Sequence, residues 1–201
     1  MTPKMPEEHA DYRRKQILDA AWTCFTEKGY NRTTIRDIAQ AMNLSTGIIY
    51  NYFDGKDDII AALHELSMEG KKRIFERLSR QETAKAALGE LFTLCLTSQE
   101  CGALRKGARG DIGMWAEALR HKKLARLFGE QLRFLRTNLA GVIGERIEEG
   151  EIRPGIDAGH AADAYIALLI GLTVIITFID DFDVPTFTEN LDRMLLENIW
   201  Q

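Results

Sequence analysis

Apolar residues recur along this chain at the three-to-four-residue spacing of α-helices. The first amphipathic stretch spans residues 11–28 and is followed by Gly29, a residue that commonly ends a helix. Further helices are predicted over residues 56–79, 82–98, 107–119, 122–149 and 157–179, with a last one from Thr186 or Thr188 to about residue 200. No segment shows the alternating pattern of a strand. The fold is therefore predicted to be all-α, with about nine helices.

Residues 33–56 are the most informative stretch, because they predict two short helices joined by a tight turn. Thr34 is a suitable N-cap for the first helix, with Asp37 in the capping-box position three residues later. Residues 43–45 interrupt the apolar pattern, and Ser45 is a suitable N-cap for the second helix. This arrangement predicts a helix-turn-helix, the motif that places its second helix in the major groove of DNA.

The stretch from Gln16 to Leu63 resembles the DNA-binding domain of the TetR/AcrR family of bacterial transcriptional regulators. Order and spacing are kept over roughly a quarter of the chain. The resemblance rests on Ile17, Ala21, Phe25, Gly29, Tyr30, Thr33, Thr34, Ile38, Ala39, Ser45, Gly47, Tyr50, Phe53 and Lys56. Asn43 stands in the turn where the family usually has Gly, and Asn is the next-best residue for a left-handed backbone.

The resemblance implies a DNA-binding surface on the helix-turn-helix. Its expected residues are Thr34, Arg36, Ser45, Thr46, Gly47, Tyr50, Asn51, Tyr52 and Lys56. Arg36, Thr46 and Asn51 are expected at the bases, where the Arg36 and Asn51 side chains suit guanine and adenine. Phosphate contacts are expected from Thr34, Tyr50, Tyr52 and Lys56. Two questions stay open: Tyr50 could instead be a core aromatic, and Arg13 and Arg14 could lie at a solvated helix start rather than on phosphates.

The helix predicted over residues 157–179 is apolar nearly all round and must be covered on every side. Its uncharged part, residues 164–179, falls short of a membrane-spanning helix, so we expect a soluble protein with no membrane partner. Together with the final helix it would form a four-helix interface between two subunits, which the family resemblance also implies. The expected interface residues are Leu168, Leu172, Ile175, Ile176, Leu191, Met194 and Leu195. The alternative is a core helix of a monomer.

Members of the family usually hold a small-molecule effector among their middle helices, and residues 114–118 resemble a common segment of that region. The expected effector-binding residues are Phe92, Cys95, Met114, Trp115, Phe128, Leu132, Tyr165 and Thr173. Met114 and Trp115 are the first candidates, as adaptable pocket lining. Ordinary core packing is the commoner role for each apolar residue of this set.

Composition supports the same class of protein. The net charge of −4 divides into +1 for residues 1–56 and −5 for the remainder, which agrees with a DNA-binding N-terminal part. Cys24, Cys95 and Cys101 show no metal-binding spacing, so buried thiols in a cytoplasmic protein are expected, with a Cys95–Cys101 redox pair as the alternative. No signal-peptide pattern and no nucleotide-binding or hydrolase motif occurs, so neither enzyme activity nor a cofactor is expected.

These expectations combine into a homodimeric, ligand-responsive transcriptional regulator, predicted to act as a repressor. Residues 1–55 are expected to form the DNA-binding domain, and residues 56–201 the effector-binding and dimerisation domain. The expected partners are a near-palindromic double-stranded DNA operator, a second copy of the chain and a small, largely apolar effector. Two alternatives stay open: the same fold without an effector, and an all-α enzyme or carrier with a vestigial helix-turn-helix.

Overall fold

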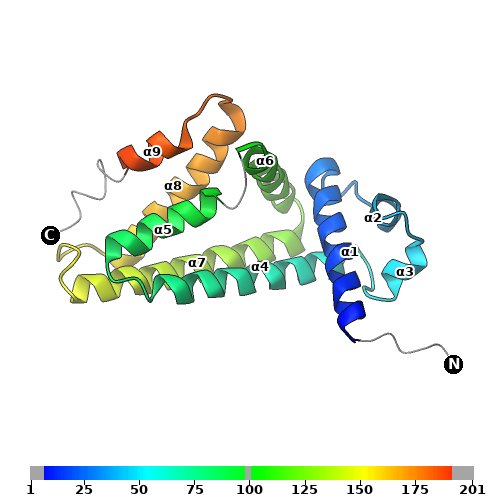
Figure 1. Cartoon of the computed structure of the whole chain (residues 1–201), viewed down its shortest axis with the longest axis horizontal. Coiled ribbons are helices and arrows are strands. Elements are labelled where there is room, and N and C mark those ends of the chain that lie inside the picture. Colours follow the sequence, from blue (N-terminus) through cyan, green and yellow to red (C-terminus); the bar gives the residue numbers. More distant parts are fainter. Residues whose placement is uncertain (1–6, 98–100, 192–201) are drawn as a thin grey trace. The chain divides into compact units, whose positions relative to one another are not determined.

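The computed structural model describes residues 7–97 and 101–191 of the chain. Within them lie nine helices and no strand, which confirms the predicted all-α fold (Figure 1). The helices are α1 (Glu7–Lys28), α2 (Ile35–Ala41), α3 (Thr46–Tyr50), α4 (Lys56–Leu78), α5 (Ala84–Thr97), α6 (Cys101–Ala118), α7 (Lys122–Glu148), α8 (Ala158–Phe178) and α9 (Val184–Leu191).

The chain divides into two compact units. The N-terminal unit contains the residues up to Met68 together with Gly113–Leu127, and the C-terminal unit contains Glu69–Ile112 and the residues from Phe128 on. Helices α4, α6 and α7 therefore each contribute to both units. The N-terminal unit is larger than the predicted domain of residues 1–55, because it includes the start of α4 and the corner between α6 and α7.

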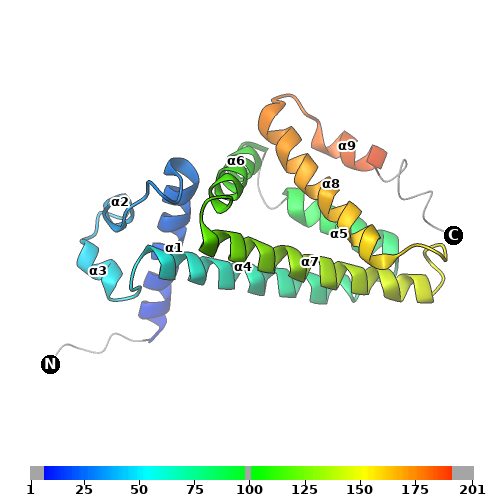
Figure 2. The same ribbon diagram turned by 180° about the vertical axis from the view of Figure 1, so that it is seen from behind.

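In the N-terminal unit, α2 and α3 lie on one side of α1 in both views (Figures 1 and 2). Their shared core consists of Ile17, Phe25, Tyr30, Ile38, Ile49, Phe53 and Ile59, each at most 2% exposed. Because these residues recur at helical spacing, one face of each helix is buried and the opposite face is left for other contacts. The core thereby fixes which face of α3 points outward.

The turns of the N-terminal unit have largely the backbone angles and the capping residues that the sequence predicts. Gly29 ends α1 with φ of 85°, and Asn43 in the α2–α3 turn has φ of 54°, the left-handed conformation expected of it. Thr34 and Asp37 form the predicted capping box at the start of α2. Ser45 is the N-cap residue of α3 but makes no side-chain capping hydrogen bond.

Four helix starts differ from the prediction by two residues or more, and one of them is that of α5, which begins at Ala84 rather than residue 82. Helix α1 begins at Glu7 rather than residue 11, and α6 begins at Cys101 rather than residue 107, because its glycines do not interrupt the helix. Helix α9 begins at Val184, since the carboxylate of Asp183 accepts a hydrogen bond from the Thr186 backbone N–H at 3.1 Å. Thr186 is thus the partner of the cap and not the first residue of the helix.

The C-terminal unit is built around one hydrophobic core. Its buried members come from α4 to α8 and from the loop before α8: Phe75, Leu78, Ala87, Leu88, Leu91, Ala108, Leu139, Val142, Ile143, Ile152, Ala162, Tyr165, Leu172 and Ile176. Helices α4 and α7 run side by side in both views (Figures 1 and 2). In the last turn of α7, the Arg146 guanidinium donates to the backbone oxygen of Gln81 at 2.6 Å and so holds the α4–α5 turn.

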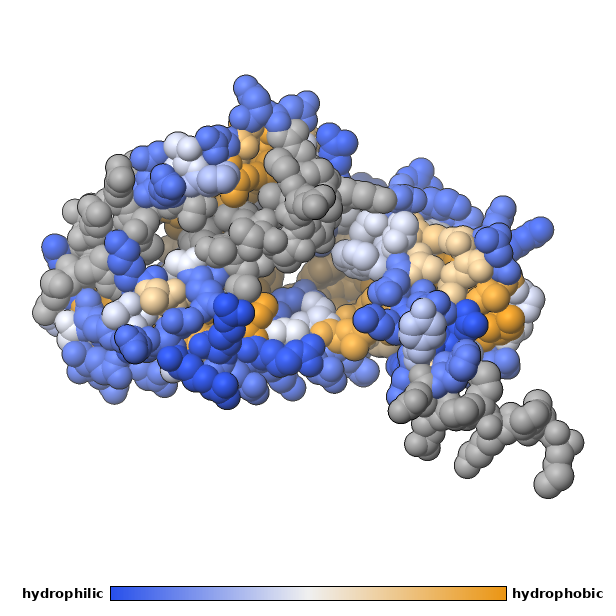
Figure 3. Space-filling model, in the orientation of Figure 1, coloured by the Kyte–Doolittle hydropathy of each residue, from blue (hydrophilic) through white to orange (hydrophobic). Residues whose placement is uncertain are grey.

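Helix α8 is only partly covered by the rest of its own chain. It begins at Ala158, capped by Asp157, and its 21 residues are long and apolar enough to cross a membrane by length and composition alone. Only 28% of that apolar stretch is buried within the described chain, so one copy alone does not cover the helix on every side. Val174, Phe178 and Ile179 are exposed, and Figure 3 shows apolar side chains near the end of α8 among hydrophilic ones.

Candidate DNA-binding surface

The outer face of the helix-turn-helix carries the side chains expected to contact DNA. Arg36 on α2 and Gly47, Tyr50 and Asn51 on or next to α3 are exposed, because Ile49 takes the inner position of α3. Tyr50 is 56% exposed and is therefore not a core aromatic. Tyr50 points outward because Ile49 and Phe53 are both buried and so direct one side of this segment into the core.

These outward side chains are available for an external partner. Within the part of the chain that the structure describes, the side chains of Arg36, Tyr50 and Asn51 make no hydrogen bond or ion pair. Arg36 presents the forked guanidinium donors that suit guanine, and the Asn51 amide presents the donor and acceptor that suit adenine. Thr46 and Tyr52 lie beside them, each half-buried. The arrangement can supply hydrogen bonds to both base edges and phosphates.

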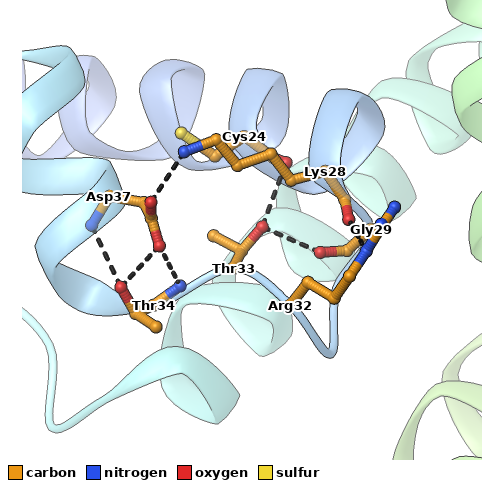
Figure 4. A network of polar contacts seen from close by, with 7 residues as sticks. All are labelled: Cys24, Lys28, Gly29, Arg32, Thr33, Thr34 and Asp37. Atoms are coloured by element: carbon orange, nitrogen blue, oxygen red, sulfur yellow. Dashed lines mark hydrogen bonds and ion pairs between the residues drawn. The ribbon is translucent and has the colours of Figure 1, made fainter.

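A polar network holds this motif on α1 (Figure 4). Lys28 Nζ at the end of α1 pairs with Asp37 Oδ1 on α2 at 2.6 Å, and Asp37 Oδ2 accepts a 2.8 Å bond from the Thr34 backbone N–H. The buried Thr33 hydroxyl lies 3.0 Å from the Cys24 oxygen and 2.8 Å from the Gly29 oxygen. The lysine and then Thr34 hold the pKa of Asp37 well below its usual range. Two helices that could shift independently are thus joined at their ends.

Lys56 is the first residue of α4, as expected, and its side chain is engaged within the protein. Its ammonium donates to the backbone oxygens of Tyr30 at 2.7 Å, Thr33 at 3.0 Å and Asn31 at 3.3 Å, and lies 4.4 Å from the Tyr30 ring centroid. All three N–H donors are used within the protein, so the ammonium serves the fold, and its expected phosphate contact stays a prediction. Burial lowers the pKa of Lys56.

Other basic residues of this unit are also engaged. The Arg32 guanidinium donates to the Lys28 oxygen at 2.7 Å, Arg13 donates to Gln16 at 2.8 Å, and Arg14 lies 4.6 Å from the Phe53 ring centroid. These contacts use only part of the donor capacity of Arg13 and Arg14, so both alternatives for these two residues stay open. The sequence alone did not indicate which basic side chains bind groups within the protein, because that depends on where the backbone carbonyls and the carboxylates lie.

A second polar cluster of the N-terminal unit was missed entirely. It joins Tyr30 and Asn31 to Asp57 on α4 and to Glu117 and Lys123 at the α6–α7 corner. The Asn31 backbone N–H donates to Glu117 at 2.8 Å, Lys123 Nζ donates to the Asp57 backbone oxygen at 2.7 Å, and the Tyr30 hydroxyl donates to the Asp57 carboxylate. The partners are far apart in sequence and show no motif that could have revealed them.

The expected effector-binding residues fall in both compact units. Met114 and Trp115 belong to the N-terminal unit, whereas Phe128, Leu132, Tyr165 and Thr173 belong to the C-terminal unit. The Tyr165 hydroxyl is buried and donates to the Leu88 oxygen, Thr173 donates to the Leu169 oxygen at 2.9 Å, and Leu132 is 44% exposed. The side chains of Phe92 and Cys95 lie outside the described residues, so the effector site stays a prediction.

The expected dimer residues divide into three groups. Leu172 and Ile176 are buried in the core of their own chain, which leaves them unable to face a partner. Leu168, Ile175 and Leu191 are half-buried, and Met194 and Leu195 lie outside the described residues. The exposed apolar residues of this region are Val174, Phe178 and Ile179, of which none was among the expected set. In the described ranges 7–97 and 101–191, no group of His, Cys, Asp or Glu is arranged to hold a metal ion.

Comparison with known proteins gives the same assignment for both parts of the chain. Residues 17–63 match the model of bacterial regulatory proteins of the tetR family, and residues 102–197 match the C-terminal model of BetI-type transcriptional repressors. A transcriptional repressor from Mycobacterium tuberculosis, Rv1474c, is 46% identical over 61 residues, which are 30% of this chain and 33% of that protein. The match with this relative thus spans about a third of its length.

Two further similarities cover most of the chain. The regulator BetI of Paraburkholderia phymatum is 27% identical over 168 residues, which are 81% of this chain and 80% of that protein. The crystal structure of a putative transcriptional regulator from Saccharomonospora viridis in complex with choline is 25% identical, covers 95% of this chain and 99% of that chain, and has a TM-score of 0.79. With a helix-turn-helix whose outer face is free and a helical C-terminal part, the chain is a transcriptional regulator of the TetR family and not an enzyme.

Proposed function

We propose that this protein is a homodimeric repressor that binds a near-palindromic operator through α3 and leaves it when a small effector binds the C-terminal unit. One observation carries the DNA-binding part: Arg36, Tyr50 and Asn51 project from a rigidly held helix-turn-helix without partners among the described residues. Side chains that are fixed at the backbone and free at their polar ends are what base recognition requires. Such a regulator acts on DNA in the cytoplasm.

The exposed apolar side of α8 supports dimerisation. Val174 is 41%, Phe178 74% and Ile179 46% exposed, on a helix whose other side packs into the core. An apolar helix face of this kind is stable in water only when a partner covers it, and a second copy of the same chain is the commonest partner. Two copies would place two copies of α3 on successive turns of one face of DNA.

An effector is supported by the comparisons. The C-terminal match is to BetI-type repressors, and a protein of similar structure has been crystallised with choline. Choline is small and carries a permanently charged quaternary ammonium group within a shell of methyl and methylene groups, so it matches the expected effector in size but not in its lack of charge. For release to follow, the effector must bind the DNA-free conformation more tightly than the DNA-bound one. The alternative of a regulator without an effector is tested in the same experiment.

The test begins with selection of bound sequences from random double-stranded DNA by the full-length protein. We expect an inverted repeat whose half-sites lie about one helical turn apart. Choline chloride is then titrated into the protein–operator complex, and release with a midpoint that depends on operator concentration is expected. Enrichment of no sequence would contradict the DNA-reading role. Binding without release by choline would favour regulation by another effector or by none.

A further inference from the structure

The outward face of the helix-turn-helix contains an exposed position that has no side chain. Gly47 is the second residue of α3, and it precedes Tyr50 by three residues and Asn51 by four. Residues at this spacing share one face of a helix. Gly47 therefore lies on the same face as two of the side chains expected to contact DNA, one helical turn away from them.

The fold of the chain does not require glycine at position 47. Its backbone is not in the positive-φ region, so a residue with a side chain can adopt the same conformation. Beyond its chain neighbours and its own helix backbone, a Cβ added to Gly47 would meet only the Ser45 hydroxyl among the described residues, at an ordinary contact distance of 3.8 Å. Gly29 is the opposite case, because its φ is 85° and an added Cβ would collide with the Glu117 carboxylate.

Glycine at position 47 also lowers the stability of α3. Glycine loses more conformational freedom on folding than any other residue, so it weakens a helix relative to alanine. Helix α3 is short, and its N-cap residue Ser45 makes no side-chain capping hydrogen bond, so little in the helix itself offsets this loss. A residue that lowers stability without a benefit inside the protein is typical of a functional surface.

Open space alone does not distinguish Gly47 from other glycines of the chain. Gly113 on α6 and Gly141 on α7 also have nothing within 4 Å of an added Cβ. Gly47 differs from them because it lies beside Tyr50 and Asn51, which are exposed and whose side chains make no hydrogen bond within the described chain. On a binding surface, a backbone without a Cβ allows a close approach of the bound molecule.

We propose that Gly47 is a specificity-determining residue of DNA recognition, because its missing side chain lets α3 lie close enough to the base edges for Arg36 and Asn51 to reach them. This inference rests on the proposed function. The major groove is about 12 Å wide and a helix with its side chains is about 10–12 Å across, so the fit leaves little room. A methyl group on the face towards DNA displaces the helix in the specific complex. Non-specific complexes rest on phosphate contacts and do not require this depth.

The experiment compares the full-length wild-type protein with Gly47→Ala and with the control Gly113→Ala. The control adds the same methyl group to an exposed glycine of the same compact unit. Thermal unfolding is measured without DNA. Both substitutions are expected to raise the unfolding midpoint by about 1–4 °C, because neither site opposes a Cβ and alanine restricts the unfolded chain.

DNA binding is expected to separate the two variants. Affinity is measured for the selected operator and for a scrambled duplex of equal length, at one fixed salt concentration. Gly47→Ala is expected to bind the operator at least about tenfold more weakly than the wild type does, and the scrambled duplex within about twofold of it. Gly113→Ala is expected to bind both duplexes as the wild type does. A gain in stability together with a loss of specific binding does not arise from damage to the fold.

Equal operator affinity of Gly47→Ala and the wild type would overturn the proposal, as would an equal loss of affinity for both duplexes. A lower unfolding midpoint of Gly47→Ala would overturn it as well, because the fold itself would then require the glycine. These outcomes leave the proposed function standing. Failure of the wild-type protein to select any DNA sequence would overturn the proposed function and this inference together.

Discussion

At the scale of single residues, the N-terminal unit uses charged side chains to satisfy its own backbone. Lys56 supplies three hydrogen bonds to the turn between α1 and α2, and Lys28 neutralises the capping carboxylate of Asp37. A buried or partly buried carbonyl that loses its donor costs more free energy than the bond itself contributes. These lysines are therefore expected to act on stability first and on DNA binding only through it.

The substitution Lys56→Met tests this role. It keeps the length of the side chain but removes the donors, so the free energy of unfolding is expected to fall by about 1–3 kcal/mol. Urea denaturation followed by circular dichroism measures this fall, with Lys15→Met on the exposed side of α1 as a control near zero. The salt dependence of DNA binding is expected to keep its slope. A slope reduced by about one would show that Lys56 neutralises a phosphate after all.

Asp111 on α6 is a second residue whose effect can be measured, through the pH dependence of the free energy of unfolding. Burial raises the pKa of its carboxyl group from 3.8 to about 6, with the charge of Lys71 opposing the shift. Because the folded protein holds this proton more tightly than the unfolded chain does, the group lowers stability as the pH rises from about 4 to above 6. The penalty is small below pH 4 and complete at pH values well above 6.

Asp111→Asn is therefore expected to raise the free energy of unfolding by about 1–3 kcal/mol at pH 7.5, on the scale of 1.4 kcal/mol per pKa unit, and by much less at pH 4. Chemical denaturation at the two pH values measures the difference. A variant that is equally stabilised at both, or destabilised at pH 7.5, would contradict the assignment of a buried, desolvated carboxyl group.

At the scale of elements, the ends of α4 and α7 are joined by a polar cluster around Arg146. Its guanidinium donates to the Gln81 backbone oxygen at 2.6 Å and to the Glu149 and Glu151 carboxylates at 2.8 Å each, and its side chain is 11% exposed. On the neighbouring helix, Glu90 pairs with Arg77 and accepts from Gln81. This cluster fixes the α4–α5 turn against α7.

Removal of the buried partner is expected to be costly. Arg146→Met leaves the Gln81 oxygen without this donor and removes one partner of the Glu151 carboxylate, so a loss of about 2–4 kcal/mol in the free energy of unfolding is expected. Arg153→Met, at an exposed arginine nearby, is the matched control and should change stability by less than about 0.5 kcal/mol. Equal effects of the two substitutions, measured by thermal or urea unfolding, would contradict the role assigned to Arg146.

Helices and turns were predictable because their causes are local. Periodic apolar residues, the Thr34–Asp37 capping box and the left-handed Asn43 all act within a few residues, and each appears in the structure as expected. The roles of Lys56 and Glu117 were not predictable, since their partners lie 23 to 86 residues away. Exposed DNA-binding candidates such as Arg36 were identified from position, whereas the expected effector residues were chosen by apolar character, which ordinary core residues share.

At the scale of the whole molecule, the described part of one chain leaves apolar side chains of α8 exposed to solvent. Leu172 and Ile176 are used within the core, while Val174, Phe178 and Ile179 remain exposed. Burial of exposed apolar area is the main driving force of subunit association, at about 25 cal/mol per Å². Dimerisation is therefore expected to depend on this side of the helix and not on the residues that face inward.

The substitution Phe178→Asp tests the interface. It places a charge on a side chain that is 74% exposed in one copy, so the fold is expected to survive while the dimer dissociates at concentrations at least about tenfold higher than for the wild type. Leu119→Asp, at a leucine that is 88% exposed in the N-terminal unit, is the control. Light scattering after size-exclusion chromatography measures the dimer. If Phe178→Asp stays dimeric down to the same protein concentration as Leu119→Asp, the proposed interface is contradicted.

The central claim is that the free side chains of the helix-turn-helix recognise base sequence. It is tested most directly by the affinity of Arg36→Ala for the selected operator and for a scrambled duplex of equal length, at one fixed salt concentration. We expect affinity for the operator to fall by about 1–3 kcal/mol per substituted contact, with affinity for the scrambled duplex nearly unchanged. An equal loss on both duplexes, or none on either, would contradict sequence recognition by this surface.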